Sequence, residues 1–219
     1  MLNPVEVRVL GALIEKEITT PDYYPLTLNA LTLACNQSSN REPVVDFDET
    51  QVVRALDALR EQKWAFLYGG AQARVPRYGH KFNEVLAVSR AETAVLCVLM
   101  LRGPQTVGEI RTRTGRMYEF ESLAEAEAVL EALGARPEGR LVTKLARQTG
   151  MKEQRYAQLL GEMPEPAAEG AAVPAPEAAT LAVRAENERL ARLEAEVAEL
   201  RQSMAELKEQ FAAFRKQFE

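Results

Sequence analysis

The stretch EKEITTPDYYPLTLNALTLACNQSSNREPV (residues 15–44, here called the polar tract) decides the fold, because its prolines and polar residues divide the chain into short elements. Proline after Tyr24 excludes helix there, so Thr19 to Pro25 is expected to be a fixed, extended connector. Its tyrosines are expected to anchor it, with one ring pointing inward. A short second helix is predicted around Leu26 to Ala34, and a polar loop follows over Asn36 to Glu42. We interpret this punctuation as structural; a partner-binding surface is the alternative.

Around this tract the chain contains two copies of one plan, whose starts lie 86 residues apart. Asn3-Pro4-Val5-Glu6 places a capping residue before a proline at the first helical position. Ser89-Arg90-Ala91-Glu92 is a capping box of the same form. After each start, apolar residues recur at matching places: Val9, Leu10, Leu13 and Ile14 in copy one, and Val95, Leu96, Leu99 and Met100 in copy two. Such a repeat indicates two related domains.

Each copy continues with two more predicted helices and a hairpin. Copy one has an apolar helix face at residues 52–59 and β-prone runs at 64–68 and 74–78 across Gly69-Gly70; copy two has a helix at 106–113, a third after the capping box Ser122 to Glu125, and a weaker hairpin signal around Leu141 to Leu145. Three helices and a hairpin make the winged-helix plan. The predicted fold class is therefore mainly α with small β-hairpins, as tandem winged-helix domains at residues 1–86 and 87–163.

Two further segments follow the repeats. Residues 164–178 are rich in alanine and proline and are interpreted as a semi-extended linker. Over residues 179–219, apolar residues alternate spacings of three and four, which predicts a C-terminal coiled-coil helix and a homodimer. The predicted dimer seam is formed by Leu190, Leu193, Val197, Leu200, Met204, Leu207, Phe211 and Phe214, with Phe218 beyond it. The alternative is a single amphipathic helix folded back on its own domains.

A set of motifs spread over residues 1–163 carries a family resemblance. The motifs include Glu15-Lys16-Glu17, Thr20-Pro21-Asp22-Tyr23-Tyr24-Pro25, Asn40-Arg41-Glu42-Pro43, Leu101-Arg102-Gly103-Pro104 and Glu153-Gln154-Arg155-Tyr156. Together they resemble the YceH family of bacterial proteins. The resemblance implies a fold of two winged helices and no assigned reaction, catalytic residue or ligand.

The residue patterns of an enzyme or a metalloprotein are missing. The single histidine, His80, and the distant Cys35 and Cys97 cannot furnish an ordinary zinc site, and no phosphate-binding glycine motif is present. His80 is interpreted as a wing or hinge residue that makes local bonds. We expect no catalytic activity, no metal and no cofactor. The start is no signal peptide and no stretch approaches the roughly 20 uncharged residues of a membrane span, so a cytoplasmic protein away from the membrane is expected.

The distribution of charge leaves two functions open. Residues 1–163 are close to neutral, with 20 Lys+Arg against 21 Asp+Glu, but their basic residues are clustered. Winged helices bind DNA through the third helix and the wing. The candidate DNA-binding residues are therefore Gln51, Arg54, Arg74, Arg77 and Lys81, with a secondary basic cluster of Arg111, Arg113, Arg140, Lys144 and Arg147.

The third helix of copy two is acidic and argues against simple DNA binding there. It carries Glu121, Glu125, Glu127 and Glu131 with no basic residue, and these acids would repel phosphate at contact. The favoured prediction is a dimer that binds double-stranded DNA, with transcriptional regulation as its extension. The alternative is a protein-interaction scaffold that binds a protein partner and no DNA.

Overall fold

The computed structural model describes residues 1–69, 75–147 and 153–161, and residues Met1–Pro164 form one compact unit. Its elements are helices with small antiparallel sheets, as the sequence predicts. Arg74, the predicted linker and the predicted coiled-coil seam lie outside the described residues.

The first half begins with a long helix whose start is fixed by local bonds. Asn3 caps the helix by accepting from the Glu6 backbone N–H, and the Glu6 carboxylate accepts from the Asn3 N–H in return. The elements in order are α1 (Pro4–Thr19), η1 (Pro21–Tyr23), β1 (Leu26–Thr27), α2 (Leu28–Cys35), α3 (Glu49–Glu61), β2 (Ala65–Tyr68), β3 (Arg77–His80) and α4 (Phe82–Leu86). The strands form an antiparallel sheet in the order β1-β3-β2.

The second half repeats this order with fewer elements. It contains α5 (Arg90–Arg102), α6 (Val107–Thr114), α7 (Leu123–Gly134), β4 (Val142–Lys144) and β5 (Tyr156–Gln158). A single bridge between Gln105 and Tyr156 takes the place that the β1–β3 pairing has in the first half. In both halves, therefore, the residues just before the second helix pair with the second strand of the hairpin.

Two local predictions need correction. The connector from Thr19 to Pro25 is not extended throughout, because Pro21–Tyr23 forms a 3₁₀ turn that the fixed φ of a leading proline favours. The second hairpin is not confined to Leu141 to Leu145: only its first strand lies there, and the second is β5. The inward tyrosine is confirmed. Tyr24 is partly buried and its hydroxyl accepts from the His80 backbone N–H at 2.7 Å, whereas Tyr23 is 75% exposed.

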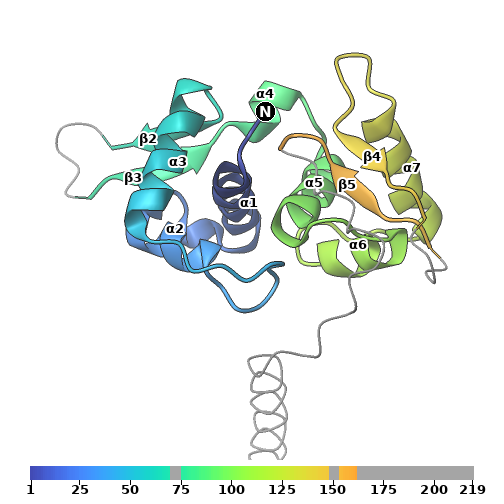
Figure 1. Ribbon diagram of the computed structural model, residues 1–219, viewed down its shortest axis with the longest axis horizontal. Helices are drawn as coiled ribbons and strands as arrows, with labels where there is room; N and C mark the ends of the chain where they lie inside the picture. The colour runs from blue at the N-terminus through green and yellow to red at the C-terminus, as the bar shows by residue number, and fades with distance from the viewer. Residues whose placement is uncertain (70–74, 148–152, 162–219) are drawn as a thin grey trace, which may run out of the picture. The chain divides into compact units, whose positions relative to one another are not determined.

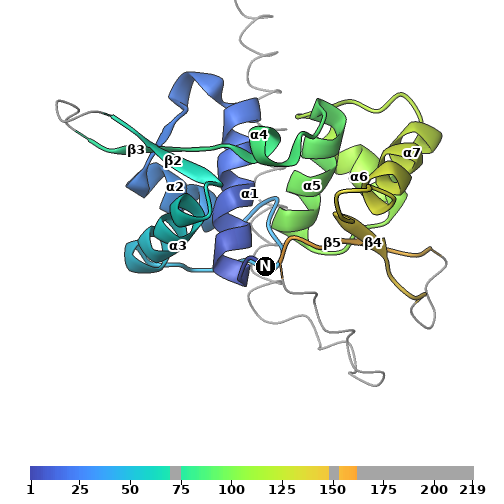
Figure 2. The same ribbon diagram turned by 90° about the horizontal axis from the view of Figure 1, so that it is seen from above.

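The core is built on the contact between α1 and α5. Both helices lie side by side in the middle of the unit, and α3 and α7 lie on its outer sides in both views (Figures 1 and 2). The contact joins equivalent positions of the repeat, since the Cys97 thiol donates to the Gly11 carbonyl, 86 residues away, at 3.4 Å. One hydrophobic cluster includes residues of both halves. The predicted boundary after residue 86 falls in the short link between α4 and α5.

Candidate functional site

On α3, the predicted DNA-binding residues Gln51 and Arg54 are both exposed. Gln51 already uses its side-chain oxygen, which accepts from the Asp48 backbone N–H at 3.0 Å to close the capping box of the helix. Arg54 forms no ion pair within the described residues, so its guanidinium is available to a ligand. One turn further along, the exposed Asp57 pairs with Arg60 at 3.0 Å.

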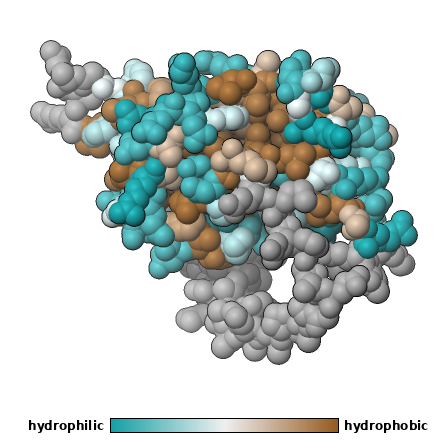
Figure 3. All heavy atoms as spheres, turned by 45° about the horizontal axis from the view of Figure 1, so that its top comes forward, coloured by the Kyte–Doolittle hydropathy of each residue, from teal (hydrophilic) through white to brown (hydrophobic). Residues whose placement is uncertain are grey.

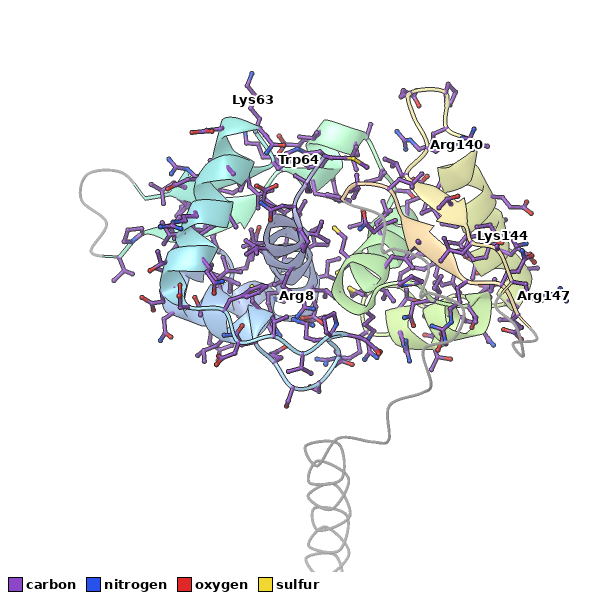
Figure 4. The ribbon with its side chains drawn as sticks, in the orientation of Figure 1. Arg8, Lys63, Trp64, Arg140, Lys144 and Arg147 are labelled. Carbon is purple, nitrogen blue, oxygen red and sulfur yellow. The ribbon has the colours of Figure 1, made fainter. Side chains whose placement is uncertain are left out.

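The basic residues of the first hairpin are exposed but differ in the hydrogen bonds that they make within the protein. Arg77 on β3 donates from Nη1 to the Pro25 carbonyl at 2.8 Å and so ties the hairpin to the connector. Lys81 directly precedes α4. Its side chain is exposed, and its backbone N–H donates to the Trp64 carbonyl. Lys63, which the sequence prediction missed, sits in a left-handed turn with φ 64° and extends outward between α3 and β2 (Figure 4). The sequence feature that could have identified it is its position directly between the predicted third helix and the hairpin.

The members of the predicted secondary basic cluster differ in the partners that they have in the fold. Arg111 donates from Nε to the Phe120 carbonyl and from Nη2 to the Glu121 carbonyl, both at 3.3 Å, and so holds the loop that precedes α7. Arg113, also on α6, pairs with Glu109 at 3.6 Å. The other three members are exposed and lie along the β4 side of the second half (Figure 4): Arg140, Lys144 and Arg147.

The exposed face of α7 is acidic and apolar. Glu127 and Glu131 are exposed, together with Leu123, which is 51% exposed. Glu125 has a structural role, because its carboxylate accepts from the Tyr118 hydroxyl at 3.0 Å and from the Glu121 backbone N–H at 2.8 Å. This face offers no cation to a phosphate backbone.

The polar tract is held together by a buried arginine. The side chain of Arg41 is 0% exposed and meets the Glu15 carboxylate on α1 with two bonds, of 2.6 Å from Nη2 and 3.2 Å from Nη1. The same guanidinium donates to the Ala34 carbonyl near the end of α2 and to the Gln37 side chain. A carbonyl in the last turn of a helix lacks an intrahelical partner. Arg41 therefore joins α1, α2 and the polar loop at one point.

A second buried arginine repeats this role. Arg8 on α1 donates from Nη1 to the Cys35 carbonyl at 3.1 Å, at the end of α2, and from Nη2 to the Pro43 carbonyl at 2.7 Å. Figure 4 shows Arg8 reaching into the space between the first helices. Burial and the nearby charge of Arg41 lower the pKa of Arg8. The structural interpretation of the polar tract is supported by these two arginines.

The pKa of the Glu15 carboxylate is set by burial and by the charges around it. Burial by itself would raise the pKa of Glu15, but the hydrogen bonds and charge of Arg41, with the charge of Lys16, outweigh burial and lower it. The carboxylate is 13% exposed and Lys16 Nζ lies 3.5 Å from it. Glu15 is therefore ionised and fully engaged at neutral pH.

His80 is built into the base of the first hairpin. Its ring is buried, and Nδ1 accepts from the Phe82 backbone N–H at 3.2 Å. Nε2 lies 2.9 Å from the Glu17 carboxylate on α1. Within the described residues, Nε2 makes no hydrogen bond despite its short distance to Glu17. These contacts support the interpretation of His80 as a residue making local bonds.

A small pocket opens where the polar loop meets the second half. Asn40 of the loop accepts a hydrogen bond from Arg102 at the end of α5, and the Glu42 backbone N–H donates to the Leu101 carbonyl at 2.9 Å. The pocket beside these bonds is lined by Glu15, Asn40, Arg102, Arg113, Arg116 and Met117, among others. We call it the arginine pocket. Sequence reasoning missed it, because its walls come from residues far apart in the chain.

The two thiols are expected to be unreactive in the folded protein. Both cysteines are free and buried, and burial raises the pKa of Cys35 to about 12 and also raises that of Cys97. At pH 8 a disulfide reagent such as DTNB should react with the native thiols slower than with the unfolded chain by about two orders of magnitude or more. Full-speed reaction of one thiol before unfolding would contradict this burial.

Neither a metal site nor a membrane span is found in the described part of the chain. Across residues 1–69, 75–147 and 153–161, no three His, Cys, Asp or Glu residues are grouped so that they could hold a metal ion. Over the same ranges, no helix combines the length and apolar character needed to cross a bilayer.

Comparison with known proteins gives similarity to proteins without an assigned activity. A family model described as a protein of unknown function, DUF480, matches residues 2–151. A UPF0502 protein of Opitutus terrae is 60% identical over 161 residues, covering 74% of this chain and 70% of that protein. A UPF0502 protein of Geotalea daltonii is 58% identical over 195 residues, with 89% and 88% covered. UPF0502 protein GSU0233 of Geobacter sulfurreducens is 56% identical over 198 residues, with 90% and 89% covered.

Proposed function

This chain belongs to the DUF480 family of proteins of unknown function, and we propose that it is a DNA-binding protein made of two winged-helix domains. One observation carries the proposal. Each half orders three helices and a hairpin, and the residues before the second helix pair with the second hairpin strand, as in Leu26 with Tyr78 and Gln105 with Tyr156. That order of helices and strands is the arrangement that places a third helix and a wing against a duplex.

The first half is the part proposed to contact DNA. Arg54 is exposed in the middle of α3, and α3 packs against β2 of the hairpin. Lys63 and Lys81 are exposed at the base of that hairpin, just before β2 and just after β3, and Arg77 lies on β3. Arg54 and Arg77 lie on the elements that face DNA in a winged helix, and each phosphate that these cations neutralise contributes to affinity. The acidic Asp57 and Glu61 on α3 limit how deeply that helix enters a groove.

Replacing Arg54 by alanine tests this surface. With labelled duplex DNA in fluorescence anisotropy, the full-length protein should lose affinity as salt rises, with a log–log slope of about −0.9 per phosphate contact. Arg54→Ala should reduce the magnitude of that slope by about 1 if Arg54 contacts a phosphate. Arg54 has no protein partner in the described residues, so the substitution should leave the fold unchanged.

The matched control is Arg90→Ala. Arg90 is also exposed but is the first residue of α5, so it lies on neither α3 nor the hairpin. The Arg90→Ala substitution removes the same charge and should leave the salt dependence of DNA binding unchanged. An equal loss in both variants would mean only that net charge had changed, and absence of binding at low salt would refute DNA binding altogether.

A second candidate function, a protein-interaction scaffold, is favoured by the second half. The exposed face of α7 carries Glu127, Glu131 and Leu123 and no basic residue. Apart from α7, Figure 3 shows hydrophobic residues gathered in the middle of one face of the molecule, between hydrophilic margins. Exposed apolar patches rimmed by polar residues mark protein interfaces more often than DNA contacts. If DNA binding fails, this is the function to test.

Dimerisation through the C-terminal helix remains part of the proposal and rests on the heptad pattern alone. Leu200→Asp combined with Leu207→Asp places charges in the predicted seam and should convert a dimer into a monomer. Light scattering measures the mass, and circular dichroism should show that residues 1–163 keep their fold. A monomeric unsubstituted protein would contradict the coiled-coil prediction.

A further inference from the structure

The residues that line the arginine pocket carry an excess of positive charge. Three guanidinium groups line it, from Arg102 at the end of α5, Arg113 on α6 and Arg116 just beyond α6. The single carboxylate among its lining residues is Glu15. Like charges brought together in a concave, partly buried site raise its affinity for an anion.

Two of the nearby acids are shared with cations outside the pocket. Glu15 is bound by both Nη atoms of Arg41, at 2.6 and 3.2 Å, and lies 3.5 Å from Lys16. Glu109 lies 3.6 Å from Arg113 but also 3.5 Å from Arg155, so one carboxylate is shared between two guanidinium groups. The acids near the pocket therefore leave its positive charge incompletely balanced.

The electrostatic state of Arg102 agrees with this geometry. Partial burial and the charges of Arg113 and Arg41 lower the pKa of Arg102, and the opposing charges of Glu42 and Glu15 do not reverse this shift. Arg102 is oriented by its hydrogen bond to the Asn40 side chain, and Asn40 has a left-handed backbone with φ 59°. The guanidinium is thus positioned before any ligand arrives, which lowers the entropic cost of binding.

We propose that the arginine pocket binds a small oxyanion, the phosphate or carboxylate group of a low-molecular-weight ligand. Guanidinium forks match the oxygens of both groups with paired charge-assisted hydrogen bonds. The pocket walls come from α1 and the polar loop of the first half and from α5 and α6 of the second. A bound anion would join the two halves beside the α1–α5 contact. This site is independent of the surface proposed to contact DNA.

Isothermal titration calorimetry of the full-length protein tests the site with two probes, inorganic phosphate and citrate, in chloride buffer at constant ionic strength. At least one probe should bind, and Arg113→Gln should weaken it about tenfold or more, the size of one lost charge-assisted pair. Arg116→Gln should weaken it in the same direction. Because Arg116 is exposed and has no protein partner in the described residues, that variant tests the site without disturbing the fold.

The control is Arg90→Gln, an exposed arginine outside the pocket, which should bind the probe as the unsubstituted protein does. No heat from either probe at millimolar concentrations would overturn the proposal, as would equal binding by Arg113→Gln, Arg116→Gln and Arg90→Gln. The salt dependence of DNA binding tests the remaining source of phosphate, which is a nucleic-acid backbone. If neither probe binds but Arg116→Gln flattens the salt dependence of DNA binding, the arginines belong to a nucleic-acid surface and the small-anion site is refuted.

Discussion

Replacing Arg41 by methionine is expected to lower the free energy of unfolding by about 3–5 kcal/mol, the range for removing one partner of a buried ion pair. The side chain of Arg41 is fully buried and binds Glu15, Ala34 and Gln37 at once. Methionine fills much of the volume but donates no hydrogen bond. The Glu15 carboxylate would retain Lys16 alone, and the Ala34 carbonyl would lose a donor near the end of α2. Urea unfolding followed by circular dichroism measures the loss.

An exposed ion pair provides the matched control. Arg60 pairs with Asp57 at 3.0 Å, with side chains 40% and 57% exposed. Arg60→Met should lower the free energy of unfolding by less than about 1 kcal/mol, as surface pairs do. If Arg41→Met were no more destabilising than Arg60→Met, the polar tract would not depend on its buried arginine.

The buried ion pair of Arg41 and Glu15 makes the stability of the protein depend on pH. The pKa of Glu15 is lower in the folded protein than its ordinary value of 4.5, so its contribution is fully present above about pH 4.5 and is lost as pH falls through the folded pKa. The difference in unfolding free energy between the unsubstituted protein and Glu15→Gln should therefore shrink as pH falls below 4.5. A difference that grew on acidification would contradict the ion pair.

Replacing Gly11 by leucine is expected to destabilise the protein by about 2 kcal/mol or more, because it overpacks the contact between the two halves. A Cβ at Gly11 would lie 3.0 Å from Leu101 Cδ2 and 3.2 Å from Met100 Cβ, both on α5. Neither α1 nor α5 can retreat without opening the shared core. Leucine favours helix over glycine by less than about 1 kcal/mol, which offsets only part of the strain.

Gly108 is the control for this substitution. It also lies in a helix, α6, but the nearest atom to an added Cβ is 4.0 Å away, Thr106 Oγ1. Gly108→Leu should be neutral or stabilising by up to about 1 kcal/mol. Thermal unfolding monitored at one protein concentration compares the two variants. Equal behaviour at the two glycines would mean that α1 and α5 are not in close contact at Gly11.

Helix starts were predictable because the bonds that form them are local. Asn3 with Glu6 and Ser89 with Glu92 form capping boxes within four residues, and both helices begin where the sequence placed them. The second helix of the second half, predicted over 106–113, is α6, Val107–Thr114. In contrast, β5 was missed, because residues 145–155 separate it from β4 in the sequence and local residues do not encode the pairing.

The functional residues were harder to predict than the elements that carry them. Arg54 and Lys81 are exposed on the expected elements. Arg111, assigned to a DNA-binding cluster, instead holds the carbonyls of Phe120 and Glu121. An arginine in a sequence is a cation of unknown orientation, and whether it meets solvent or a carbonyl depends on residues brought near it by folding.

Periodicity, capping residues and the internal repeat were enough to predict the longer helices, the presence of the first hairpin and the duplication, since each depends on residues that are neighbours in the chain. They did not predict α4 or β1, and they placed the second strand of the first hairpin at residues 74–78, whereas β3 is Arg77–His80. The buried bonds of Arg8 and Arg41, the packing of α1 on α5 and the arginine pocket depend on contacts between residues far apart in the chain, such as Gly11 and Cys97, which are 86 positions apart. Contacts of that kind are set by the packing of one hydrophobic core that includes residues of both copies.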